Sequence, residues 1–205
     1  MYSSKNLKCF FLYLGIFFIV VIIGTLAHEL GHYIVAVIYG VPAQISYGHT
    51  HYFGSLTADQ RFWFLMGGPI STWLVSTMGV IVILCKYRHM HNEKDLHIGI
   101  GQSISTVATS FSLRFIFNTG LYFINRSLLD IPSVTDETLI AGYLGINPDF
   151  LMYGSALVGL IFIVIAFYYL PHFQRYIIFI DTIIGGILGY FFWFYWIGPI
   201  ILPRP

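Results

Sequence analysis

The pentapeptide HELGH at residues 28–32 is the segment of this sequence with the clearest chemical meaning. On a helix, His28 and His32 project from the same face, because they are four residues apart, and both imidazoles can reach one metal ion. Zinc held by two imidazoles and a carboxylate keeps one position open for water, and a neighbouring glutamate such as Glu29 can accept a proton from that water. The pattern predicts zinc ligands at His28 and His32 and a catalytic base at Glu29.

The surroundings of HELGH strengthen this interpretation. The pentapeptide lies in the second half of an apolar run at about residues 7–39, which is longer than the roughly 20 residues that a transmembrane helix needs. Burying an ionisable group in a bilayer costs free energy, and such groups are usually functional there. Three of them close together by coincidence would add three of these costs without any benefit, which makes coincidence a poor explanation. We therefore expect a metal site within a membrane segment.

The composition places the whole chain in a lipid bilayer. Its 205 residues are 57% hydrophobic and only 9% charged, with a mean hydropathy of +0.77, and one small soluble core cannot hide so much apolar surface. The net charge of +1, without a sustained stripe of Lys and Arg, excludes nucleic acid as a partner. We expect one membrane-embedded domain over residues 1–205, with the bilayer as its surroundings.

Hydropathy and the positions of helix-breaking residues predict five membrane-spanning helices. After the run at 7–39, the expected spans are at about residues 62–84, 97–123, 150–170 and 176–202. Residues 44–57 are rich in Thr, Tyr and Ser and contain two glycines, which favours a short β-hairpin. The expected fold class is an all-α polytopic membrane protein with a short hairpin after its first helix.

The distribution of positive charge predicts the orientation of the chain. The residues on the side of the N-terminus are Lys5, Lys8, Lys86, Arg88, Lys94 and Arg175, and those on the opposite side are Arg61, Arg126 and Arg204. The positive-inside rule then places the N-terminus in the cytoplasm, and we expect a multi-pass protein of the plasma membrane. The same count places the HELGH end of the first helix away from the cytoplasm.

A HELGH on the first long apolar helix of a polytopic protein resembles the site-2 protease family of intramembrane zinc metalloproteases. Gly68-Pro69 in MGGPIS is similar to the family's Gly-Pro signature, although Thr72 stands where that signature often has asparagine. The resemblance implies a zinc endopeptidase that cleaves membrane proteins or peptides within or beside the bilayer. It also implies that the hairpin at 44–57 helps to hold the substrate as an extended strand.

The resemblance further implies a third zinc ligand, an aspartate near the start of a later helix and usually followed by glycine. This chain has no Asp-Gly pair, and the candidates are Asp130, Asp136 and Glu137. Asp136 is preferred because an asparagine and a proline precede it and because a helix can start there, while Asp130 is the alternative. An aspartate at this position could equally be a helix cap. With five spans, this loop and His32 emerge on the same face.

Other ionisable residues invite interpretation. Asp181 and Arg114 fall within expected spans, where they either pair with each other or Asp181 supports the zinc ligands or a proton path. His49 and His51 alternate along an expected strand and could share a metal. An exposed loop pair is the favoured interpretation of these two, because HELGH already supplies histidine ligands.

Two other classes of function compete with a protease. One is a metal-binding membrane protein without protease activity, and the other is an ion-coupled transporter whose intramembrane His, Asp and Arg form an ion path. Glu29 discriminates against the first, because a purely structural metal site has no need of a glutamate beside its ligand. A transporter predicts an internal inverted repeat, and the sequence contains none.

Overall fold

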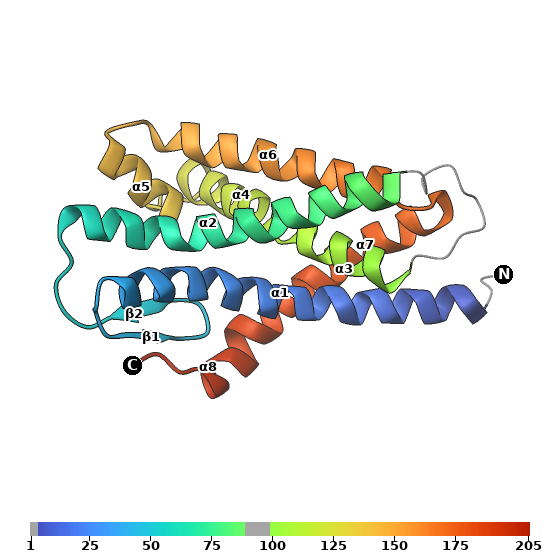
Figure 1. Ribbon diagram of the computed structural model, residues 1–205, viewed down its shortest axis with the longest axis horizontal. Helices are drawn as coiled ribbons and strands as arrows, with labels where there is room; N and C mark the ends of the chain where they lie inside the picture. The colour runs from blue at the N-terminus through green and yellow to red at the C-terminus, as the bar shows by residue number, and fades with distance from the viewer. Residues whose placement is uncertain (1–3, 89–98) are drawn as a thin grey trace.

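Long helices lie side by side along the long axis of the molecule (Figure 1). The computed structural model describes residues 4–88 and 99–205. Among these, four helical runs are long and apolar enough to cross a membrane: Phe10–Ile38, Ala58–Tyr87, Pro148–Tyr168 and Gln174–Ile201. The expected class, an all-α polytopic membrane protein with a small hairpin, is confirmed.

These runs correspond to the longest helices of the fold. They are α1 (Ser4–Ile38), α2 (Ala58–Val82) with the π-helix η1 (Ile83–Tyr87), α6 (Pro148–Tyr168), and α7 (His172–Phe192) with η3 (Trp193–Ile197) and α8 (Gly198–Ile201). Large apolar side chains remain exposed along them, among them Ile19, Ile23, Leu157, Ile161 and Ile187. An apolar outer surface of this extent suits lipid rather than water.

The expected span at 97–123 is divided between α3 (Ile100–Ser110) and α4 (Leu113–Ser127), and residues 97 and 98 lie outside the described part of the chain. At the junction, the N–H of Ser112 bonds to the carbonyl of Thr109 at 3.1 Å, three residues back. The Ser112 hydroxyl also donates to that carbonyl, and such local bonds bend helices. In the described residues, four helices rather than five therefore meet the length and hydropathy of a span. Together α3 and α4 still follow the long axis (Figure 1).

Glycine brings α1 and α2 into backbone contact beside the HELGH motif. A Cβ added to Gly31 would lie 2.2 Å from the carbonyl oxygen of Gly67, and one added to Gly67 would lie 2.5 Å from that of Gly31. Small residues of this kind allow membrane helices to approach closely. The contact fixes the segment around Gly68-Pro69 against the second half of α1.

A short antiparallel hairpin follows α1, as expected for residues 44–57. It consists of β1 (Ala43–Ile45) and β2 (Thr50–Tyr52), with Gln44 opposite His51. The C-terminal segment holds the hairpin turn, because the Nε1–H of Trp193 donates to the carbonyl of Tyr47 at 2.6 Å and the N–H of Tyr47 donates to the carbonyl of Leu202 at 3.0 Å. The hairpin is thus tied to the end of the chain.

The short helix α5 (Asp136–Leu144) begins within the polar stretch between α4 and α6. Thr135 caps it, since its hydroxyl accepts a hydrogen bond from the N–H of Thr138 at 3.3 Å. Gly145 ends it with a φ of 66°, a left-handed conformation that glycine adopts without strain. Because α5 packs against α2 and α6, its first residue, Asp136, is directed back toward the bundle.

Candidate metal centre

Two imidazoles and one carboxylate meet between α1 and α5. The Nε2 atom of His28 lies 2.8 Å from Oδ2 of Asp136 and 3.3 Å from Nε2 of His32, and the latter lies 3.3 Å from the same Oδ2. Zinc bonds to nitrogen and oxygen are about 2.0–2.2 Å long, so neighbouring ligands in a tetrahedral site are roughly 3.3 Å apart. The three atoms therefore form a triangle close to the size of one face of that tetrahedron.

The hydrogen bonds behind the imidazoles direct their lone pairs to one point. Nδ1 of His32 lies 2.6 Å from the carbonyl oxygen of Phe64, which can only accept a hydrogen bond, so this nitrogen carries the hydrogen. Nδ1 of His28 lies 3.0 Å from the hydroxyl of Thr72, which itself donates to the carbonyl of Gly68. Both neutral imidazoles therefore present an unprotonated Nε2. Three acceptor atoms at these distances need a cation or protons between them, which fits a metal-ligand set.

Gly68 provides the space in which the ligand atoms meet. A Cβ at this position would lie 2.3 Å from Nε2 of His32 and 2.4 Å from Nε2 of His28. Any side chain there would push the imidazoles away from their common point. Gly68 thus has a physical role at this centre, and the hydroxyl of Thr72 contacts His28.

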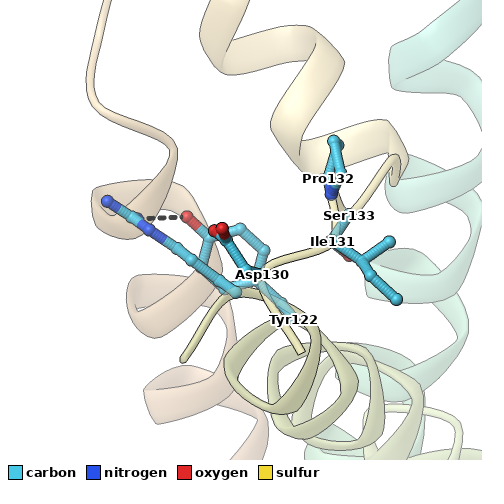
Figure 2. Close-up of a pocket in the computed structure, with 6 residues that line it drawn as sticks. Tyr122, Asp130, Ile131, Pro132 and Ser133 are labelled. Carbon is cyan, nitrogen blue, oxygen red and sulfur yellow. Dashed lines mark hydrogen bonds between the residues drawn. The ribbon is translucent and has the colours of Figure 1, made fainter. Parts of the chain in front are cut away.

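The structure separates the two aspartates considered as the third ligand. Asp136 has a side chain that is 21% exposed and touches both histidines. Asp130 is exposed, in a surface pocket that Tyr122 and Arg126 also line (Figure 2). Asp136 alone of the two is placed to act as a ligand.

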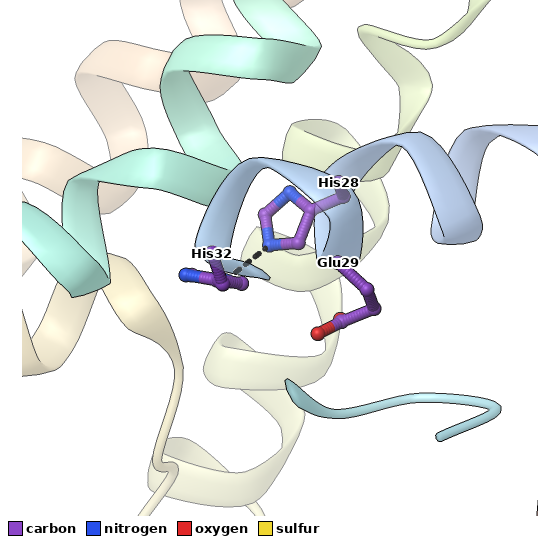
Figure 3. A group of neighbouring side chains, drawn as sticks. All are labelled: His28, Glu29 and His32. Carbon is purple, nitrogen blue, oxygen red and sulfur yellow. Dashed lines mark hydrogen bonds between the residues drawn. The ribbon is translucent and has the colours of Figure 1, made fainter. Parts of the chain in front are cut away.

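Glu29 is buried, only 3% exposed, beside the histidines. Its carboxylate lies within 4.8 Å of their ligand nitrogens, and Figure 3 shows it extending toward the neighbouring strand rather than into the gap between the imidazoles. The hydroxyl of Thr50, on β2, lies 3.1 Å from Oε2 and 2.8 Å from the carbonyl oxygen of Glu29. Nothing in the local sequence pattern marks Thr50, because the contact depends on how the hairpin folds back onto α1.

The prediction that Asp181 pairs with Arg114 is wrong. Both carboxylate oxygens of Asp181 are buried, and neither has a hydrogen-bond partner in the part of the chain that the structure describes, which includes Arg114. One turn further along α7, Gly185 packs against Leu14, which is about 20 Å along α1 from His28. Asp181 therefore lies in the other half of the bundle and does not support the metal ligands either.

The histidines of the hairpin stay apart from the centre. His49 is exposed and His51 is half-buried, with their ring centroids 6.3 Å apart. The cluster of metal-ligating side chains found in the described residues consists of His28, Glu29 and His32 and includes neither of them. His49 lies in the turn, as the loop interpretation expects, whereas His51 is part of β2.

Comparison with known proteins finds no matching family model, no similar curated protein and no similar solved structure. The fold and the centre define a class: a polytopic helical membrane protein with a candidate metal site at the junction of α1, α2 and α5. The resemblance to site-2 proteases rests on HELGH and Gly68-Pro69 themselves.

Proposed function

We propose that this protein is an intramembrane or membrane-proximal zinc metalloprotease that hydrolyses peptide bonds of membrane-associated substrates. The observation that carries the proposal is the convergence of Nε2 of His28, Nε2 of His32 and Oδ2 of Asp136 at 2.8–3.3 Å. Bound there, zinc supplies a Lewis acid for the scissile carbonyl and lowers the pKa of a water molecule.

The chain's own residues have distinct tasks in this mechanism. Glu29 accepts the proton of the attacking water at its carboxylate and returns it to the nitrogen of the leaving amine. Thr50 restrains the Glu29 carboxylate through the 3.1 Å contact to Oε2. Thr72 and the carbonyl of Phe64 keep the two imidazoles in the tautomer and orientation that metal binding needs.

The hairpin is suited to present an extended substrate. β1 and β2 form a two-stranded sheet, so each strand has one edge that could pair with an added strand. Peptide segments commonly bind by such strand addition, and β2 carries the Thr50 that contacts Glu29. A substrate strand on this sheet would run past the base with its carbonyls accessible.

The decisive experiment combines metal analysis with a cleavage assay on purified protein in detergent. Wild type, Glu29→Gln, Asp136→Asn and Asp130→Asn are compared, using a mixture of internally quenched apolar peptides as the substrate. We expect wild type, Glu29→Gln and the control Asp130→Asn to retain zinc, and Asp136→Asn to lose it. Only wild type and Asp130→Asn should cleave. A wild type without zinc, or a Glu29→Gln variant that cleaves normally, contradicts the proposal.

A metal-binding protein without protease activity is the second candidate, and the position of Glu29 supports it. Because its carboxylate is within 4.8 Å of the histidine nitrogens, a rotation could make Glu29 a fourth ligand and close the site, as in structural zinc centres. In that case Glu29→Gln would lower zinc affinity and wild type would not cleave. Retention of zinc by Glu29→Gln excludes Glu29 as a ligand, and cleavage by wild type excludes this function.

A further inference from the structure

Arg114, at the start of α4, is a cation with no ion-pair partner among the described residues. Its side chain is half-buried, and its Nε atom is buried without a hydrogen-bond acceptor. The ion pairs among the described residues within 4 Å join His28 and His32 to Asp136 and Arg126 to Asp149, and none involves Arg114. An arginine inside a membrane protein is costly and usually functional, so its unpaired state needs an explanation.

Aromatic contacts fix Arg114 at the level of the metal centre. The next residue, Phe115, stacks on Trp73 of α2 with ring centroids 4.3 Å apart and an interplanar angle of 11°. Trp73 directly follows Thr72, whose hydroxyl contacts Nδ1 of His28. On its other side α4 contacts α7, with the rings of Phe117 and Tyr190 4.9 Å apart. The N-terminal half of α4 therefore touches α2 through Phe115 and α7 through Phe117, while the helix packs chiefly against α6.

The charge of Arg114 acts on the groups that would surround a reacting carbonyl. It interacts electrostatically with His28, Glu29 and Glu137. Glu137 follows Asp136 on α5, is 5% exposed, and forms no ion pair within 4 Å among the described residues. The charge of Arg114 therefore influences one histidine of the centre, the proposed base and a second buried carboxylate, and among the described residues it forms no ion pair with them within 4 Å.

We propose that Arg114 is a further catalytic residue, which donates hydrogen bonds to the oxyanion formed at the scissile carbonyl. This inference rests on the proposed protease function. The oxygen of water bonds to the carbonyl carbon, the π pair moves onto the carbonyl oxygen, and Glu29 takes the water proton. When the C–N bond breaks, the pair on the oxygen re-forms the carbonyl and the amine nitrogen takes the proton from Glu29.

Arginine is chemically suited to this task. Its guanidinium stays charged at any working pH and presents several N–H donors in a planar fork. A donor that is held in place before the reaction stabilises the transition state more than the ground state, and removing one such donor costs about 10²–10³-fold in kcat. The ring contacts of Phe115 with Trp73 and of Phe117 with Tyr190 hold in place the part of α4 that carries Arg114.

The test compares Arg114→Gln and Arg114→Lys with Arg126→Gln as the matched control. Arg126 lies on the same helix but at the surface, paired with Asp149 and Tyr122. For each variant we would measure zinc content, kcat and KM on the quenched apolar peptides, and the Kd of a phosphinic peptide, whose anionic tetrahedral phosphorus mimics the intermediate. An uncleavable peptide of the same sequence reports ground-state binding.

We expect Arg114→Gln to keep zinc and bind the uncleavable peptide normally, while its kcat and its affinity for the phosphinic peptide both fall about 10²–10³-fold. Arg114→Lys should lose less, and Arg126→Gln should match wild type. Normal kcat and normal phosphinic-peptide binding in Arg114→Gln would refute the role. A raised KM with unchanged kcat in Arg114→Gln would also refute the role. That result is expected if Arg114 only binds an anionic group of the substrate.

The two proposals fail in distinguishable ways. If wild type neither binds zinc nor cleaves, the protease function is wrong and the role of Arg114 is wrong with it. If wild type cleaves, Glu29→Gln does not, and Arg114→Gln is unimpaired, only the inference on Arg114 is overturned. Should Arg114→Gln lose zinc or aggregate, Arg114→Lys decides, since it preserves the charge and most of the side-chain volume.

Discussion

Replacing Gly68 by alanine tests whether the two imidazoles meet at a functional point. The added Cβ would lie 2.3 and 2.4 Å from the two Nε2 atoms, whereas ordinary contacts begin at 3.4 Å. The imidazoles must therefore retreat by about 1 Å, which exceeds the tolerance of zinc–ligand distances of about 0.2 Å. Loss of a residue that only orients a ligand costs about 10–100-fold in metal affinity, so displacing both ligands should cost at least that much.

The effect of Gly68→Ala on folding should be small in comparison. Alanine is favoured over glycine by about 1 kcal/mol within a helix, which partly offsets an overpacking cost of about 1–3 kcal/mol. We expect the metal-free variant to unfold close to wild type while its zinc affinity, measured by competition with a chelator, falls. The control is Gly186→Ala, a helical glycine with nothing within 4 Å of the added Cβ. Wild-type zinc affinity in Gly68→Ala would refute the geometric argument.

Three further substitutions probe how the centre is supported. Thr72→Val removes the hydroxyl 3.0 Å from Nδ1 of His28 and should weaken zinc binding about 10–100-fold by chelator competition, whereas Thr72→Ser should not. Thr50→Val frees the Glu29 carboxylate, so kcat should fall while zinc content stays normal, and a lower zinc content would contradict this. Trp193→Phe leaves a hairpin carbonyl without its donor and should lower the free energy of unfolding by about 1–3 kcal/mol; unchanged denaturant midpoints would argue against the tether.

The parts of the centre that depend on local spacing could be predicted from the sequence. His28 and His32 share a helix face because the period of the helix fixes it, and hydropathy marks the helix that carries them. Asp136 was preferred over Asp130 because a helix could start there, and Asp136 is indeed the first residue of α5. Its assignment as a metal ligand stays a prediction, as do the protease activity, the plasma membrane and the cytoplasmic N-terminus.

Features that depend on tertiary packing could not be predicted in this way. Thr50 reaches Glu29 only because the hairpin folds back onto α1. Their position in expected spans suggests that Asp181 and Arg114 pair, but Gly185 and Gly189 of α7 pack against Leu14 and Phe18 in the first half of α1, which keeps Asp181 far from the centre. The break between α3 and α4 comes from serine and threonine hydroxyls that bond to nearby carbonyls, which a hydropathy average does not register.

The backbone contact of Gly31 with Gly67 also limits the routes to the centre. At Gly31 and Gly67, the main chains of α1 and α2 touch, so no space remains between them for another chain. A molecule in the lipid therefore cannot enter between α1 and α2 at this point. The hairpin covers another side of the centre, where Thr50 contacts Glu29, and the C-terminal segment holds its turn through a few hydrogen bonds. Close packing through glycine backbones on one side and a hydrogen-bonded hairpin on another therefore differ in how much rearrangement would be needed to admit a further chain.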